Sequence, residues 1–392
     1  MLIAAACRSV CLLLCAGALA GQASEAMKCD TTAAFSLAKQ RLQAKRYDDA
    51  VATLDKLKSC DGLSPLDVFE MGWMYGRARN FADALKLFRS VPGDIPDRAS
   101  HHYAIALSAF ELADYRSTIE ELKILEVEGL LNAESANLLA VSYSKLGFYV
   151  QAEATLVQEL GHNRDDLTAY LNLVTLYAEQ GRFAEAKQIA SDAARTFPNS
   201  SAVFVVRGAA NTLIGQLDDA YEDFSKAVSL APDKADPRFF LALTRYKQGR
   251  FADAISSLKS DNRLGIADSD LHYLLAECLL KVNGAKTQTV MAELDLAIRM
   301  NANSVSARAL RGRLLLQSGR VKEAATDLEL ALRQDPNSRS AAYSLARTYQ
   351  RLGRIEESRL LFERLRNAKP DSLDEFSQRR LNEALTEKGV QQ

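Results

Sequence analysis

The side chains best suited to chemistry are the histidines, and their spacing predicts no reactive centre. His101 and His102 are adjacent, so their side chains diverge on a helix, and His162 and His272 stand alone. None of the four lies at a spacing that metal ligands use. The sequence also has no glycine-rich phosphate loop, nucleophile elbow or zinc-protease motif. It therefore predicts no enzymatic activity, no metal and no cofactor.

Glycines and prolines instead mark a 34-residue repeat. Two consecutive copies, 167–200 and 201–234, end in Pro198-Asn199 and Pro232-Asp233. The eighth unit is longer than the others by two residues, and no linker separates any two units. Stepping by this length in both directions gives ten units: 31–64, 65–98, 99–132, 133–166, 167–200, 201–234, 235–268, 269–304, 305–338 and 339–372.

Each unit has small residues at two fixed positions and a break between them. The eighth residue is Gly or Ala in nine of the ten units, and the twentieth is most often Ala. Apolar residues follow helical spacing, which is interrupted near the fifteenth residue, where six units have a Gly that can end a helix. Each unit is therefore predicted to be helix, tight turn, helix, with positions eight and twenty facing each other.

This pattern resembles the tetratricopeptide repeat (TPR), which has small residues at the eighth and twentieth positions and Pro at the thirty-second. Five units have that proline: Pro96, Pro198, Pro232, Pro336 and Pro370. The resemblance implies an all-α fold, a right-handed TPR superhelix (α-solenoid) of about ten helix-turn-helix repeats over 31–372. Residues 373–392 are predicted to form a capping helix and tail, because the last repeat of a solenoid otherwise exposes an apolar face.

Two units differ from the others at their seventh and twenty-third positions. The seventh residue is Arg in these units, where the others mostly have Leu, Ile or Met, and the twenty-third is Asp. A half-buried Arg without its carboxylate is costly. We therefore predict two ion pairs within repeats, Arg207–Asp223 and Arg311–Asp327; an anion site is the alternative.

The N-terminus has the pattern of a secretory signal peptide of bacterial type. Arg8 precedes an apolar run from Val10 to Ala20 that is too short to span a bilayer comfortably. Cleavage could follow Ala20 or Ala23. Residues 1–23 are therefore predicted to be a removed signal peptide, and the mature chain to be periplasmic or secreted, with no membrane span.

Export permits disulfides, and three cysteines lie beyond the signal segment. Cys29 precedes the first helix of the first unit, and Cys60 ends its second helix. Because these ends of an antiparallel hairpin are neighbours, a Cys29–Cys60 disulfide is predicted. Cys278 is most simply a small buried residue.

The TPR resemblance implies a concave groove, lined by the first helices, in which partner peptides lie. Carried onto this frame, the groove positions are the second, fifth, ninth, twelfth and thirteenth of each unit. Apolar side chains there could anchor a partner, although packing between repeats explains any one of them equally well. They are Phe69, Trp73, Tyr103 and Phe110 in units two and three, and Phe239, Leu243 and Tyr246 in unit seven.

The net charge of −1, with 25% charged and 48% hydrophobic residues, gives no overall attraction to nucleic acid. Arginines nevertheless gather at groove positions of units nine and ten: Arg313, Arg347 and Arg351. A partner segment with acidic residues and apolar anchors would fit this part of the groove. A solvated arginine-rich face is the alternative.

Together these features predict a non-enzymatic protein–protein interaction scaffold in the cell envelope, which binds peptide or helical segments of partners. One alternative is a periplasmic holdase or assembly factor that uses the aromatic groove for unfolded clients. Another is a TPR subunit of a polysaccharide-export or envelope-assembly complex. A single stoichiometric partner favours the scaffold, whereas many weak clients favour the holdase.

Overall fold

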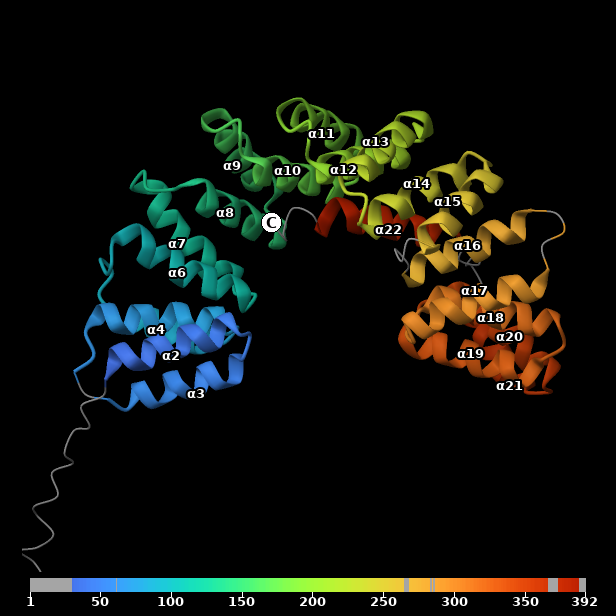
Figure 1. The fold of residues 1–392 in the computed structure, drawn as a ribbon, viewed down its shortest axis with the longest axis horizontal. Helices are drawn as coiled ribbons and strands as arrows, with labels where there is room; N and C mark the ends of the chain where they lie inside the picture. Colours follow the sequence, from blue (N-terminus) through green and yellow to red (C-terminus); the bar gives the residue numbers. More distant parts are fainter. Residues whose placement is uncertain are drawn as a thin grey trace, which may run out of the picture. The chain divides into compact units, whose positions relative to one another are not determined.

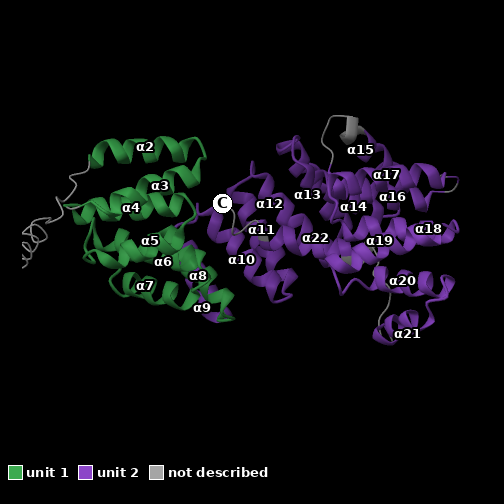
Figure 2. Cartoon of the chain, turned by 90° about the horizontal axis from the view of Figure 1, so that it is seen from below, with its two compact units in different colours: residues 1–148 green, residues 149–392 purple. Residues whose placement is uncertain are grey.

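The computed structural model describes residues 30–60, 62–263, 268–282, 284, 286–365 and 373–387. Every regular element in these ranges is an α-helix, and the helices follow one another in pairs (Figure 1). The chain divides into two compact units (Figure 2), one ending at Phe148 and one starting at Tyr149. The division falls inside the predicted repeat 133–166, so each unit is described by itself.

The first unit contains the helices from α2 to α8. They are α2 (Thr31–Gln43), α3 (Tyr47–Lys58), α4 (Pro65–Arg77), α5 (Phe81–Ser90), α6 (Arg98–Glu111), α7 (Tyr115–Val127) and α8 (Ala133–Lys145). The second unit contains the helices from α9 to α22. They are α9 (Tyr149–His162), α10 (Leu167–Glu179), α11 (Phe183–Thr196), α12 (Ser201–Leu213), α13 (Leu217–Leu230), α14 (Ala235–Lys247), α15 (Phe251–Arg263), α16 (Ser269–Lys281), α17 (Thr287–Met300), α18 (Val305–Gln317), α19 (Val321–Gln334), α20 (Arg339–Arg351), α21 (Ile355–Arg364) and α22 (Leu373–Glu387).

The helix boundaries follow the 34-residue frame. In nine of the ten repeats the first helix begins at the first residue, and α6 begins one residue earlier, at Arg98. The second helix begins at the seventeenth residue in every repeat except the eighth. There α17 begins two residues later, at Thr287, in the repeat that has two extra residues.

Small residues at the eighth position are required by close contact with the second helix. A Cβ atom added to Gly72 would lie 2.5 Å from the ring of Phe88. Across another hairpin, the hydroxyl of Thr118, at position twenty, donates a hydrogen bond of 3.2 Å to the carbonyl of Ala106, at position eight. The predicted facing of positions eight and twenty is therefore confirmed.

The turn inside the repeats uses a left-handed residue at position fifteen. Glycine supplies it in six repeats, with φ between 71° and 81°: Gly147, Gly181, Gly215, Gly249, Gly319 and Gly353. In the first three repeats Lys45, Arg79 and Ala113 take the same conformation, with φ of 56°, 62° and 59°. This geometry costs a non-glycine residue roughly 1 kcal/mol, so the turn is set by the packing of the two helices.

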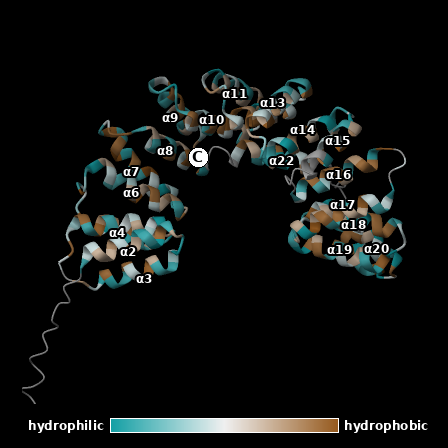
Figure 3. Cartoon of the chain, in the orientation of Figure 1, coloured by the Kyte–Doolittle hydropathy of each residue, from teal (hydrophilic) through white to brown (hydrophobic). Residues whose placement is uncertain are grey.

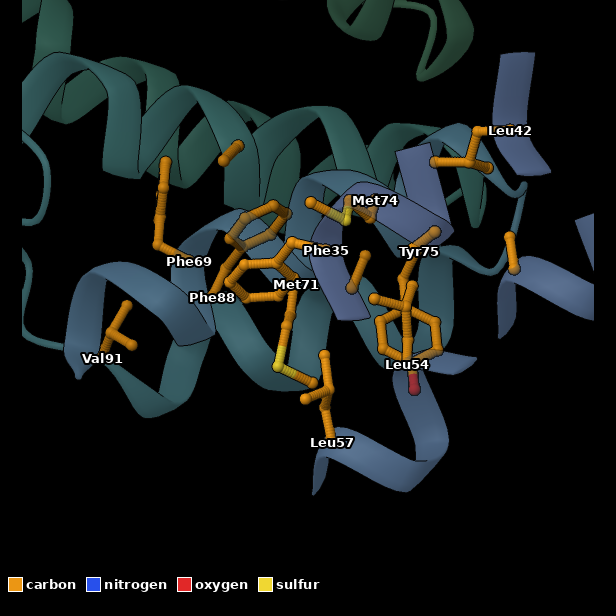
Figure 4. Close-up of a cluster of buried hydrophobic side chains, with 14 of the residues drawn as sticks. Phe35, Leu42, Leu54, Leu57, Phe69, Met71, Met74, Tyr75, Phe88 and Val91 are labelled. Atoms are coloured by element: carbon orange, nitrogen blue, oxygen red, sulfur yellow. The ribbon is translucent and has the colours of Figure 1, made fainter. Parts of the chain in front are cut away.

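Each helix carries both hydrophobic and hydrophilic residues (Figure 3), as expected for helices that bury one face. In the first unit the buried core includes Phe69, Met71, Tyr75 and Phe88 (Figure 4). The Tyr75 hydroxyl donates a 2.6 Å hydrogen bond to Asp55 of the preceding repeat, which ties α4 to α3. None of the helices among the described residues has the length and apolar character needed to cross a bilayer.

Both predicted ion pairs are present. Arg207 Nε donates to the two Asp223 carboxylate oxygens at 2.9 and 3.1 Å, and Asn211 donates to the same carboxylate at 2.9 Å. Only 4% of the Asp223 side chain is exposed, against 26% for Arg207. Burial raises the pKa of the Asp223 carboxyl, even though Arg207 acts in the opposite direction. Arg207 and Asn211 therefore stabilise the charged form of the Asp223 carboxyl against the effect of burial.

The second pair belongs to a larger cluster. Arg311 donates to Asp327 at 2.6 and 2.7 Å and to Asp295, on the preceding repeat, at 2.6 Å. Arg308 also donates to Asp327, at 3.1 Å. The cluster joins α17, α18 and α19. Asp327 and Asp295 accept the hydrogen bonds that Arg311 would otherwise donate to an external anion, which argues against the alternative of an anion site.

Two of the mature cysteines can be placed. Cys60 is disulfide-bonded and Cys278 is a free, buried thiol. Burial raises the pKa of Cys278 to about 12, which makes it unreactive at neutral pH. Cys29 and the signal segment 1–23 lie outside the described residues, so the Cys29–Cys60 pairing stays a prediction.

The terminal helix α22 is not where a capping helix should be. It packs extensively on α10 and α12, the first helices of the fifth and sixth of the ten repeats (Figures 1 and 2). The prediction that residues 373–392 cap the last repeat is therefore wrong for the described part, 373–387. α22 instead buries its apolar side chains on first helices of earlier repeats, where Phe376 contacts Phe239 of α14 and Tyr273 of α16.

Candidate functional site

The candidate site is the surface of the second unit on which α22 lies. α22 is amphipathic: Phe376, Leu381, Ala384 and Leu385 are buried, whereas Arg379 is exposed. Ala384 and Leu385 lie three and four positions after Leu381, and Phe376 lies five positions before it, so these residues lie on one side of the helix. That face is turned toward the first helices of four repeats.

An aromatic contact holds the N-terminal part of α22. The Phe376 ring lies edge-on to Phe239 of α14, with centroids 5.9 Å apart, and to Tyr273 of α16, with centroids 4.9 Å apart. Such edge-to-face pairs stabilise beyond the area they bury. Phe376 thus fills a position between two consecutive repeats.

A charge contact follows one helical turn later. Arg380 Nη2 donates to Asp236 of α14 at 3.1 Å, and its Nε lies 3.1 Å from an oxygen of Asp270 of α16. The Arg380 side chain is 22% exposed. Burial raises the pKa of the Asp270 carboxyl, and the nearby Arg380 charge opposes that effect. The two acids are at the same position of consecutive repeats and present one site for a cation.

The C-terminal part of α22 reaches the fifth repeat. The Thr175 hydroxyl of α10 donates a 2.6 Å hydrogen bond to the backbone carbonyl of Leu385. That carbonyl is among the last four of the helix, which have no partner within it. α22 therefore runs from repeats seven and eight back to repeat five, and its free end is bound by a side chain of the array.

These contacts fall on the groove positions that the TPR resemblance implied. Asp236 and Asp270 are second residues of their repeats, Phe239 and Tyr273 are fifth residues, and Thr175 is a ninth residue. We call the surface formed by α10, α12, α14 and α16 the central groove. Its occupant is a helix of the same chain.

The predicted apolar residues of the seventh repeat are less accessible than expected. Phe239 and Leu243 are buried, with 0% and 1% of their surface exposed, so the prediction that they present an open anchor surface is wrong here. Phe376 covers Phe239, and the neighbouring Phe240 packs against it. Tyr246 is half-buried and lies edge-on to Phe251.

The aromatic residues of the first unit also pack between helices. Phe69 is 3% exposed and belongs to the core, which corrects its assignment as an exposed anchor. Trp73 is half-buried against Phe69 and Phe88. Tyr103 and Phe110 are also half-buried. Burial, together with Glu134, raises the pKa of Tyr103 to about 12.

The three predicted groove arginines are all exposed, but one has a structural contact. Arg351 donates a 2.7 Å hydrogen bond to the Leu316 carbonyl of the preceding repeat. Arg313 counteracts the rise that burial causes in the pKa of Glu277 on α16. Arg313 thus acts on a carboxyl of the preceding repeat but stays exposed, as does Arg347, and these two are the better candidates for contact with a partner.

Sequence reasoning missed the acidic pair and the occupant of the groove. Asp236 and Asp270 occupy the second position, which the TPR resemblance had placed in the groove. A comparison of the second residue between consecutive repeats could have identified this acidic pair. No comparable pattern in the sequence predicts where α22 docks, because its apolar spacing fits a capping helix equally well. Within the described ranges, no group of three His, Cys, Asp or Glu side chains is arranged to hold a metal ion.

Comparison with a solved structure agrees with the fold. A tetratricopeptide repeat protein from Parabacteroides merdae ATCC 43184 is 17% identical, covers 64% of this chain and 98% of its own, and gives a TM-score of 0.51. Yeast Tom70 is also 17% identical, with coverage of 91% and 96% and a TM-score of 0.44. No curated protein sequence matches the chain.

The repeat frame, the helix pairs and the groove define this chain as a TPR protein. Residues 97–348 match the model of the family described as the cilia and flagella-associated protein 70 C-terminal domain, and residues 339–364 match a tetratricopeptide repeat model. The chain belongs to this TPR family.

Proposed function

We propose that the chain is a non-enzymatic protein-interaction scaffold of the cell envelope that holds helical or extended segments of partners on its first helices. One observation carries the proposal: a helix, α22, already lies on groove positions of repeats five, seven and eight. This is the helix-in-groove mode of recognition, in which an amphipathic helix lays its apolar face on a hydrophobic surface. Membership of a TPR family supports the same role.

Repeats nine and ten supply a second surface with a different charge. Arg313 on α18 and Arg347 on α20 are exposed and occupy the ninth positions of consecutive repeats. Clustered arginines favour acidic partners and increase the rate at which they associate. We propose that a partner segment with acidic residues binds there.

The test is a crosslinking capture from envelope extract with the full mature chain. A variant with Arg313→Glu and Arg347→Glu is compared with wild type, and Arg299→Glu serves as the matched control. Arg299 is an exposed arginine on the second helix α17, away from the groove positions. The scaffold proposal requires a partner of fixed stoichiometry that is lost in the double variant and retained in the control.

Two other outcomes contradict the proposal. Many weakly bound clients on all three proteins indicate a holdase. A partner that binds the double variant and the control equally well uses a different surface of the chain.

Export rests on the signal-like segment 1–23, and the Cys60 disulfide fits an oxidising compartment. We predict that the protein made with its N-terminus in an exporting cell begins after Ala20 or Ala23. Under denaturing, non-reducing conditions it should then react with alkylating agent at one thiol, Cys278. Intact mass checks both points. A retained leader, or three reactive thiols in the mature chain, would refute export or the Cys29–Cys60 pairing.

A further inference from the structure

We infer that the central groove recognises one particular helical motif, and that α22 is the version of this motif built into the chain, which a partner helix must displace. The inference rests on the proposed function and specifies its ligand. The motif has an aromatic residue, a basic residue four positions later, and aliphatic residues five and nine positions later. In α22 these are Phe376, Arg380, Leu381 and Leu385.

Each element of the motif has its own counterpart in the groove. The aromatic residue meets Phe239 and Tyr273 at centroid distances of 5.9 and 4.9 Å. The basic residue lies 3.1 Å from Asp236 and 3.1 Å from Asp270. A helix with an acidic residue at this point would place like charges together and would be rejected.

The end of the motif is also recognised. Thr175 donates to the carbonyl of Leu385, two residues before α22 ends at Glu387. A helix that continued past this point would use this carbonyl for its own hydrogen bonds. The groove therefore favours a helix that ends close to the second aliphatic residue.

The repeats also have packing contacts that do not involve α22. The helices α10, α12, α14 and α16 each pack against the second helix of their own repeat, and α22 lies outside the repeat frame. A helix of 15 residues is marginal in water by itself. Because α22 is attached to the chain, its effective concentration at the central groove is high, and a partner helix with the same motif must compete with it. Hence α22 lowers the apparent affinity of the groove for partners without blocking it permanently.

The experiment uses the full mature chain and a fluorescent synthetic peptide with the sequence of residues 373–387. Arg380→Glu opposes Asp236 and Asp270 and should release α22. Arg379→Glu makes the same charge change on the neighbouring residue, whose side chain is 53% exposed. We expect the peptide to bind Arg380→Glu about tenfold or more tightly than it binds wild type or Arg379→Glu.

The sequence requirement is tested with a second peptide that carries Arg380→Glu itself. It should bind the opened chain about tenfold or more weakly than the native peptide, because it meets the two acids. Circular dichroism of the variants checks that the repeats remain folded. Equal binding of the native peptide to all three proteins, or equal binding of both peptides to the opened chain, would overturn the inference.

A photo-crosslinker at position 376 identifies which chain supplies the helix. In a mixture of isotopically light and heavy chains, crosslinks to α14 or α16 should be within one chain. Crosslinks between light and heavy chains would show that the occupant is α22 of a second copy, and would overturn the intramolecular assignment.

If the peptide experiment fails while Arg313→Glu with Arg347→Glu still loses a partner, only this inference fails. If Arg313→Glu with Arg347→Glu loses no partner while the peptide binds as expected, only the proposed function is refuted.

Discussion

Replacing Asp223 by Ala is expected to destabilise the second unit by about 3–5 kcal/mol, because the change leaves a partly buried guanidinium without its carboxylate. Arg207 is only 26% exposed, and Asn211 loses an acceptor in the same change. Hydrogen exchange measured by mass spectrometry over α12 and α13 is the appropriate readout, since an array of repeats need not unfold in one step.

Two further variants test whether the cost of Asp223→Ala comes from leaving Arg207 without its partner. Arg207→Leu combined with Asp223→Thr introduces residue types that other repeats use at these positions, and it should cost clearly less than Asp223→Ala. Asp295→Ala should cost about 1 kcal/mol or less, because Asp295 is 44% exposed and Arg311 keeps Asp327. Equal losses in the single and the double Arg207–Asp223 variants would contradict the pairing.

Gly72→Ala is expected to destabilise the first unit by roughly 1–3 kcal/mol, although alanine is the better helix former. The new methyl group would lie 2.5 Å from the Phe88 ring. That ring cannot move aside, because it packs against Phe69 and Trp73 with centroid distances of 5.1 and 5.6 Å. Trp73 is the single tryptophan of the chain, so its fluorescence during urea unfolding reports on this unit.

The matched control is Gly76→Ala, one turn later on the same helix. A Cβ atom at Gly76 meets nothing within 4 Å. This substitution should stabilise the unit by about 0.5–1 kcal/mol through helix propensity alone. A shift of both urea midpoints in the same direction would mean that the contact with Phe88 does not determine the residue at position eight.

The groove of the second unit has two parts of opposite charge. Asp236 and Asp270 make the part under α22 selective for a basic residue, whereas Arg313 and Arg347 offer exposed positive charge in the later repeats. The expected partner with acidic residues therefore suits repeats nine and ten only. A partner that binds along both parts would need a basic helix followed or preceded by an acidic segment.

The candidate site could be predicted only in part. The groove positions included Phe239, but its accessibility depended on a helix more than 130 residues later in the chain. Trp73, Tyr103 and Phe110 also lie at groove positions, and each is half-buried in the structure. Periodicity assigns a residue to a face of a helix, but other elements decide how much of that face remains open.

The sequence by itself determined the repeat length, the start of nearly every helix and the two ion pairs. These features depend on contacts within one repeat or between adjacent repeats, where a position in the frame implies its neighbours. The tertiary structure alone decided the position of α22, the burial of Phe239 and the pairing of Arg380 with two acids. An amphipathic helix can bury its apolar face on any complementary surface within reach. Its docking site is therefore set by competition among surfaces of the folded chain, and no local pattern records the result.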